Sequence, residues 1–113
     1  MSRETYVLSK VKDLLSFEQQ VYLSWEDHGE DDNAIEFAKR RCEAINIIYC
    51  AASATSITEA VTFANTLHVQ ASREFDVCED ENEGYLMTGF ISGLEEVVDE
   101  IEKAENAHRH NDL

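Results

Sequence analysis

Proline is absent from this chain of 113 residues, and glycine occurs only four times. Proline ends helices and glycine weakens their interior, so the scarcity of both favours long helices over a fold rich in turns. Long apolar runs are missing too: the longest, Ile47–Ala52, is far short of the roughly 18 residues that a membrane-spanning helix needs. Residues Met1–Thr5 contain no apolar signal region. We therefore expect a helical protein without a membrane span.

Cysteine is scarce, and its three positions, Cys42, Cys50 and Cys78, are odd in number. On one helix Cys42 and Cys50 would lie about 12 Å apart, which is too far for a disulfide bond. Reduced thiols are typical of a reducing compartment, so the cysteine pattern predicts a cytoplasmic location.

Positive charge is also scarce: nine Lys and Arg residues face 24 Asp and Glu residues, which gives a formal net charge of −15 at pH 7. Such a surface repels nucleic acids and anionic membranes, so we predict direct binding to neither. Solubility requires far less charge than this, and the excess opposes compaction by self-repulsion. The acids are also clustered, six each in Glu26–Glu36, Glu74–Glu83 and Glu95–Glu105. This clustering indicates a basic protein partner.

Apolar residues recur at helical spacing in four segments, which begin near Ser2, Asn33, Ser56 and Tyr85. Ser56-Ile-Thr-Glu59 matches a capping box, and Asn33 followed by Glu36 predicts a second capped start. The pattern predicts an all-α fold, an antiparallel four-helix bundle, with one acidic domain over residues 1–107 and a flexible tail over 108–113. A three-helix variant stays open, because neither glycine nor proline interrupts residues 33–75.

In an up-down-up-down bundle the first and third connections lie at the same end. The acids of the first two clusters would then form one acidic pole. Along the fourth segment Glu95, Asp99 and Glu102 follow one helical stripe, while Glu96 and Glu100 form a neighbouring row. Together with three nearby aromatic residues, these acids are the predicted partner-binding residues: Glu26, Asp27, Glu30, Asp31, Asp32, Glu79, Asp80, Glu81, Glu83, Glu95, Glu96, Asp99, Glu100, Glu102, Tyr22, Trp25 and Tyr85.

Two short runs are similar to metal-binding motifs. The run Glu79-x-Glu81-x-Glu83-Gly84 resembles the start of a calcium-binding EF-hand loop, but its twelfth position is Phe90, where a bidentate Glu is required. Glu96-Val-Val-Asp99 has the ExxD form of the all-α nucleotide pyrophosphatases, without the ExxE pair that precedes it in that family. The four histidines do not have zinc-site spacing, and no catalytic triad is assignable by position. We expect no cofactor, no metal and no enzymatic activity.

Gly89-x-x-x-Gly93 gives the fourth segment a smooth face, which favours close packing against a neighbouring helix or a second copy of the chain. Two arrangements would use this face: packing inside the bundle, or formation of a homodimer.

In size, helicity and charge the chain resembles the immunity proteins that neutralise nuclease toxins. This resemblance implies an acidic, non-enzymatic inhibitor of a basic protein, such as a nuclease or DNA-binding protein. A closely related hypothesis is a phage-type DNA mimic that blocks a host defence enzyme. A metal-dependent nucleotide hydrolase using Glu95, Glu96 and Asp99, and a helical adaptor, are the alternatives from other classes.

Overall fold

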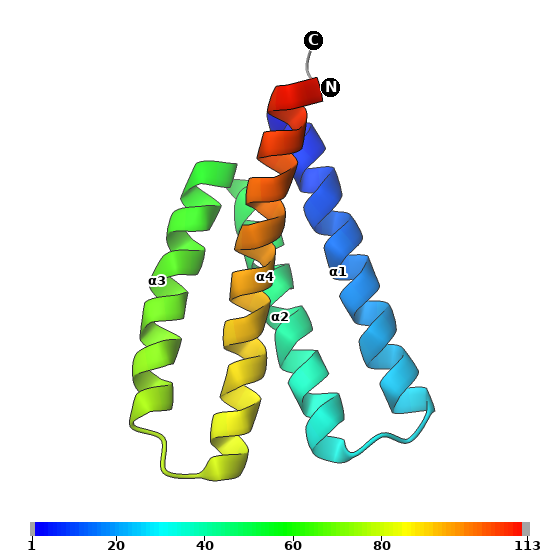
Figure 1. The fold of residues 1–113 in the computed structure, drawn as a ribbon, viewed down its shortest axis with the longest axis vertical. Coiled ribbons are helices and arrows are strands. Elements are labelled where there is room, and N and C mark those ends of the chain that lie inside the picture. Colours follow the sequence, from blue (N-terminus) through cyan, green and yellow to red (C-terminus); the bar gives the residue numbers. More distant parts are fainter. Residues whose placement is uncertain (1, 112–113) are drawn as a thin grey trace.

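The computed structural model describes residues 2–111 and contains four helices, connected in an up-down-up-down order (Figure 1). The helices are α1 (Arg3–Asp27), α2 (Asp32–Ala54), α3 (Ile57–Asp76) and α4 (Glu81–Asn111). No strand occurs between residues 2 and 111. The predicted all-α four-helix bundle is confirmed. The three-helix variant is wrong, because α2 ends at Ala54. No helix in the described part of the chain is long and apolar enough to cross a membrane.

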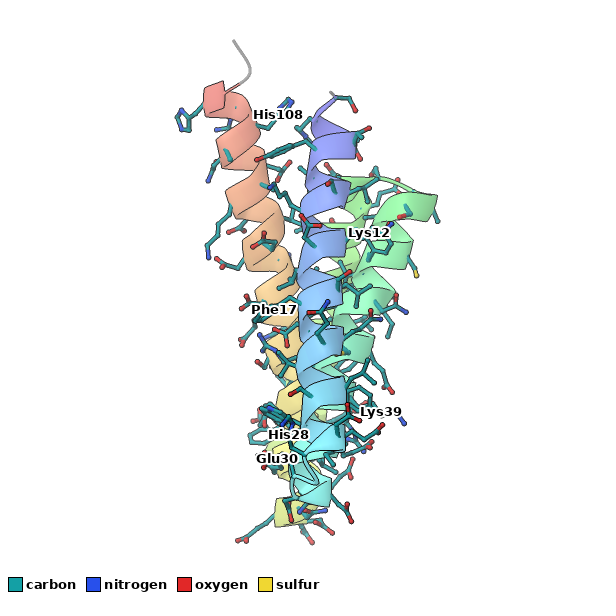
Figure 2. All side chains as sticks on the ribbon, turned by 90° about the vertical axis from the view of Figure 1, so that its right-hand side faces the viewer. Lys12, Phe17, His28, Glu30, Lys39 and His108 are labelled. Atoms are coloured by element: carbon teal, nitrogen blue, oxygen red, sulfur yellow. The ribbon has the colours of Figure 1, made fainter. Side chains whose placement is uncertain are left out.

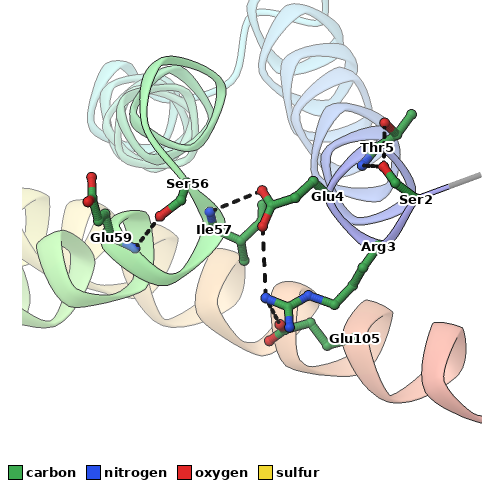
Figure 3. Close-up of polar contacts among 8 residues, drawn as sticks. All are labelled: Ser2, Arg3, Glu4, Thr5, Ser56, Ile57, Glu59 and Glu105. Carbon is green, nitrogen blue, oxygen red and sulfur yellow. Dashed lines mark hydrogen bonds and ion pairs between the residues drawn. The ribbon is translucent and has the colours of Figure 1, made fainter.

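Two residues separate α2 from α3 without glycine or proline. Thr55 leaves the helical conformation (φ −124°, ψ −98°), and Ser56 is extended. The Ser56 hydroxyl accepts a hydrogen bond from the Glu59 amide at 3.1 Å, as a capping residue does. The Ile57 amide donates instead to the Glu4 carboxylate of α1, at 3.3 Å (Figure 3). The joint is therefore stabilised by its own serine and by a neighbouring helix.

The start of α2 differs from the sequence prediction. Asp31 caps this helix, because its carboxylate accepts from the Asn33 amide at 3.0 Å. The predicted cap, Asn33, lies within the first turn. Both residues favour cap positions, so the polar run around them does not distinguish one from the other.

The end of α4 extends past the predicted boundary at residue 107. Residues 108–111 form its last turn, and the ring of His108 lies 5.5 Å from that of Tyr6. Residues 112 and 113, the rest of the predicted tail, lie outside the described residues. The flexibility of this tail stays a prediction.

The core lies between α2 and α4, which pack along much of their length with α1 and α3 on either side (Figure 1). Close approach of this pair depends on the two glycines of the predicted smooth face. A Cβ atom on Gly93 would stand 2.5 Å from the Arg41 carbonyl oxygen, and one on Gly89 would stand 2.7 Å from that of Phe37. Both glycines are buried, so this face packs inside the bundle. The large, fully buried residues of the core are Val7, Val11, Ile45, Ile48, Ile57, Leu94, Val97 and Ile101.

The bundle opens toward the end that carries the first and third connections (Figure 1). Buried residues of α1 stop at Glu18, and those of α3 stop at Ala64. Within residues 19–27 and 65–76 every side chain is at least partly exposed. Apolar residues in these segments therefore face solvent, among them Leu23, Val69 and Phe75.

Candidate partner-binding surface

The α1–α2 and α3–α4 connections lie at the same end of the bundle, as the sequence predicted (Figure 1). We call residues 26–36 and 74–83 the acidic end. In the turned view, Glu30 and His28 lie at this end and His108 lies at the opposite one (Figure 2). The two connections flank the first turns of α2 and α4, which stand between them (Figure 1). The predicted pole is therefore a row of acids across four helix ends.

Two acids of this row have a structural role. Asp31 caps α2, and Asp80 caps the start of α4 by accepting from the Glu83 amide at 3.0 Å. Negative charge at a helix N-terminus also stabilises the helix dipole. Folding thus explains the acids at the starts of α2 and α4.

The acids at the C-terminal ends of α1 and α3 have no such explanation. Glu26 and Asp27 lie in the last turn of α1, and Glu74 and Asp76 lie in the last turn of α3. A negative charge at a helix C-terminus opposes the dipole, at a cost of about 0.3–1 kcal/mol each. Residues 24–27 of α1 contain no basic residue to offset it. The last turn of α3 does contain a basic residue, Arg73, beside its acids. The helix dipole therefore does not account for the acids at these two helix ends, least of all for those of α1.

Arg40 is the cation that the fold places among these acids. Its guanidinium lies 2.9 Å from the Glu83 carboxylate of α4 and 3.5 Å from that of Glu36, one turn earlier in α2. The hydrogen bond to Glu83 raises the pKa of Arg40. Lys39 is exposed beside it. The acidic end therefore stays strongly negative around one partly neutralised patch.

Along α4, the predicted stripe is partly used in ion pairs. Glu95 lies 3.0 Å from His68 of α3, and Asp99 lies 2.9 Å from Lys103. In the neighbouring row Glu96 lies 3.6 Å from Arg41. These three carboxylates remain 39–63% exposed, and their role in binding a partner stays a prediction. Glu102 is exposed, and Glu100 is half-buried.

His68 bridges α3 and α4 at a second, smaller hollow, which Glu95, Asp99 and Glu102 also line. Its side chain is about a third exposed. The sequence places this histidine on the apolar side of its helix, but α3 leans away from the core there and leaves the ring at the surface.

The three predicted aromatic residues lie near the acidic end in different settings. The Tyr22 hydroxyl donates to Glu26 at 3.0 Å, and this hydrogen bond raises the pKa of Tyr22. Trp25 is half-buried. Tyr85 is 44% exposed and stacks on Phe37, with ring centroids 5.0 Å apart. Sequence reasoning missed Phe37, which joins α2 to α4 at this end.

A groove between α3 and the α2–α4 pair was also missed. It opens at the acidic end, with a volume of about 640 Å³. Apolar side chains from α3 and α4 form its floor, and carboxylates from three helices form its rim. The lining residues are Glu36, Arg40, Glu43, Leu67, Gln70, Ala71, Glu74, Glu83, Met87 and Phe90. We call it the α3 groove.

The carboxylates assigned to the hydrolase alternative contact three different side chains. Glu95 contacts His68, Glu96 contacts Arg41, and Asp99 contacts Lys103. Across residues 2–111, no group of three or more His, Cys, Asp and Glu side chains is arranged to hold a metal ion. The ExxD pattern therefore has no second carboxylate pair beside it in the fold.

Comparison with known proteins assigns the chain to no family. No family model matches its sequence, no curated protein matches it, and no solved structure matches its fold.

Proposed function

We propose that this protein is a non-enzymatic inhibitor that binds and neutralises a basic, nucleic-acid-acting protein through its acidic end. The proposed partner is of the nuclease-toxin type, and the proposed mechanism is charge complementarity. Attraction between opposite charges speeds encounter and selects the partner, since like-charged proteins are repelled.

The observation that carries the proposal is the placement of acids where folding disfavours them. Glu26, Asp27, Glu74 and Asp76 lie at the C-terminal ends of α1 and α3, where the helix dipole disfavours negative charge. They share this end of the bundle with the acidic starts of α2 and α4. A cationic partner would relieve this repulsion on binding. The stabilisation lost from the free protein would then reappear as affinity.

Helical spacing supports a partner that normally binds a nucleic acid. Carboxylates one turn apart on a helix lie about 5–6 Å from each other, which is comparable to successive phosphates on a strand. Glu95, Asp99 and Glu102 follow this spacing on α4. The same argument supports the phage-type DNA mimic, which differs in its partner and shares this chemistry.

The first experiment is capture at low salt on the immobilised protein, followed by elution with a salt gradient. We expect a cationic nuclease or DNA-binding protein that elutes at moderate salt and loses its activity when the protein is added back. A captured partner that stays active, or that remains bound at 1 M NaCl, would contradict the proposal.

Charge reversal locates the surface. Glu30→Lys with Glu79→Lys changes both connections without touching a cap or an ion pair given above, and we expect it to weaken binding at least tenfold. Asp13→Lys with Ser9→Lys and Asn106→Lys makes the same change in net charge at exposed positions away from the acidic end and is the matched control. Equal losses from both variants would indicate attraction to total charge, without a defined surface.

The hydrolase alternative has a direct test. A magnesium-dependent assay across a nucleotide panel is expected to show no turnover above that of the Glu96→Gln variant. Turnover that this substitution abolishes would replace the inhibitor proposal.

A further inference from the structure

The α3 groove combines an apolar floor with a negative rim. Its floor consists of Leu67 and Ala71 from α3 and Met87 and Phe90 from α4, all only half-buried. Burial of apolar surface is worth about 25 cal/mol per Å², so this floor gains stability when something covers it.

The charges on the facing helices oppose closure of the bundle over the floor. Closing α3 onto the α2–α4 pair would bring Glu74 of α3 toward Glu43 of α2 and Glu83 of α4. Arg40 already engages Glu36 and Glu83. Like charges opposite one another repel, so the rim opposes a closer approach of α3 to α2 and α4.

Charge also decides what covers the groove. Four carboxylates and one guanidinium line it, so its rim is negative. A second copy of the chain, with a net charge of −15, is a poor occupant. A cationic segment with an apolar face satisfies both the floor and the rim.

The length of the groove corresponds to about two turns of a helix. Each wall presents a stripe at helical spacing, over residues 36–43 of α2, 67–74 of α3 and 83–90 of α4. Eight helical residues extend about 10 Å, or roughly two turns. Grooves of this kind bind amphipathic helices through apolar residues at i, i+3 or i+4, and i+7.

We propose that the α3 groove binds a basic amphipathic helix. Its apolar stripe would lie on Leu67, Ala71, Met87 and Phe90, and its flanking Lys or Arg residues would face Glu43 and Glu74. This inference deepens the proposed function, on which it rests for the claim that the helix belongs to the basic partner.

The test uses three synthetic peptides and the full chain. The first has Leu at i, i+3, i+4 and i+7 and Lys elsewhere, the second has the same composition in scrambled order, and the third has Glu in place of Lys. Binding is measured by fluorescence anisotropy, and the site is mapped by amide chemical-shift changes. We expect the first peptide to bind at least tenfold more tightly than the second, with shifts at the groove, and the third not to bind.

Substitutions distinguish peptide binding in the groove from general electrostatic attraction to the acidic protein. Leu67→Gln removes an apolar floor residue, and Val69→Gln makes the same change on an exposed position of α3 outside the groove. We expect roughly tenfold weaker binding for Leu67→Gln and less than twofold for Val69→Gln. Glu74→Lys is the second groove variant, and circular dichroism confirms that each variant folds.

Equal binding of the patterned and scrambled peptides, or equal effects at Leu67 and Val69, would overturn the groove proposal. So would self-association of the chain that Leu67→Gln abolishes. Failure of the inhibitor proposal is a different result: the captured partner would then be insensitive to Glu30→Lys with Glu79→Lys. Peptide binding at the groove does not depend on that result.

Discussion

The guanidinium of Arg41 lies between carboxylates from two other helices. It lies 3.1 Å from Glu18 of α1 and 3.6 Å from Glu96 of α4, and it also donates to the Ser92 hydroxyl. Glu18 is the one buried acid among the described residues. Burial opposes the charge of Arg41, but the neighbouring carboxylates outweigh burial and raise its pKa. One side chain thus joins α1, α2 and α4.

Substitution at Arg41 tests this junction. Arg41→Met leaves the buried Glu18 carboxylate without its partner, so we expect the free energy of unfolding to fall by about 3 kcal/mol. Adding Glu18→Leu removes the unpaired charge and is expected to restore most of the loss. Urea unfolding measures both. The exposed Arg73→Met is the control, with an expected change within about 0.5 kcal/mol. Additive losses in the double variant would contradict a coupled pair.

Cys42 gives a pH-dependent prediction. Burial raises the pKa of this thiol to about 11 from an ordinary value of 9.0, and the nearby Glu18 carboxylate adds to the shift. Between pH 9 and pH 11 the unfolded chain releases this proton while the folded chain retains it, so stability falls as the pH rises. We expect a decline of about 1–2 kcal/mol across this range that is missing in Cys42→Ala. Urea unfolding at pH 8, 9, 10 and 11 measures it, and parallel curves for the two proteins would refute it.

At the scale of a helix, the glycines of α4 differ in what surrounds them. A Cβ atom on Gly93 would meet backbone of α2, whereas one on Gly84 would make an ordinary contact, 3.6 Å from the ring of Phe75. Gly93→Ala is expected to destabilise the protein by about 2 kcal/mol through overpacking. Gly84→Ala is expected to stabilise it by about 0.5–1 kcal/mol, because alanine favours the helix. Thermal unfolding measures both shifts. A stabilising Gly93→Ala would mean that α2 and α4 are not held this close.

The four helices could be predicted from the sequence because the spacing of apolar residues and the capping residues are short-range patterns. The hydroxyl of Ser56 and the apolar stripes of all four helices are examples. Helix ends were harder, as at Asp31 and Asn33, where two good capping residues lie close together. The end of α4 was missed because His108 contacts Tyr6, a residue distant in sequence.

The candidate surface was predictable to the extent that topology decides it. Alternating helices bring the two acidic connections to one end whatever the packing details. Ion pairs such as Glu96 with Arg41, and the α3 groove, depend on how far α3 diverges from α2 and α4. That divergence comes from contacts between helices, and no local pattern in the sequence encodes it.

For the whole molecule, salt is expected to act on folding and binding with opposite signs. Raising NaCl from 0.02 M to 0.5 M shortens the screening length from roughly 20 Å to roughly 4 Å, which weakens repulsion among the acids. We expect the free energy of unfolding to rise by about 1 kcal/mol and the affinity for a basic partner to fall.

Urea unfolding and partner titration at each salt concentration measure these two slopes. Glu30→Lys with Glu79→Lys changes the net charge from −15 to −11, two units per substitution. We expect this variant to reduce the salt dependence of both the free energy of unfolding and the affinity for the partner. A stability that salt leaves unchanged would show that self-repulsion is not a significant cost in this fold.

Arg3 near the start of α1 and Glu105 near the end of α4 form an ion pair at 3.1 Å (Figure 3). The two extremities of the bundle therefore lie together, on the side remote from residues 26–36 and 74–83 (Figure 1). A tether or fluorescent tag attached by either extremity would orient every copy alike on a sensor chip, with the carboxylates directed toward the flowing sample. Two tags, one on each extremity, would report on unfolding by energy transfer and leave the opposite side unobstructed.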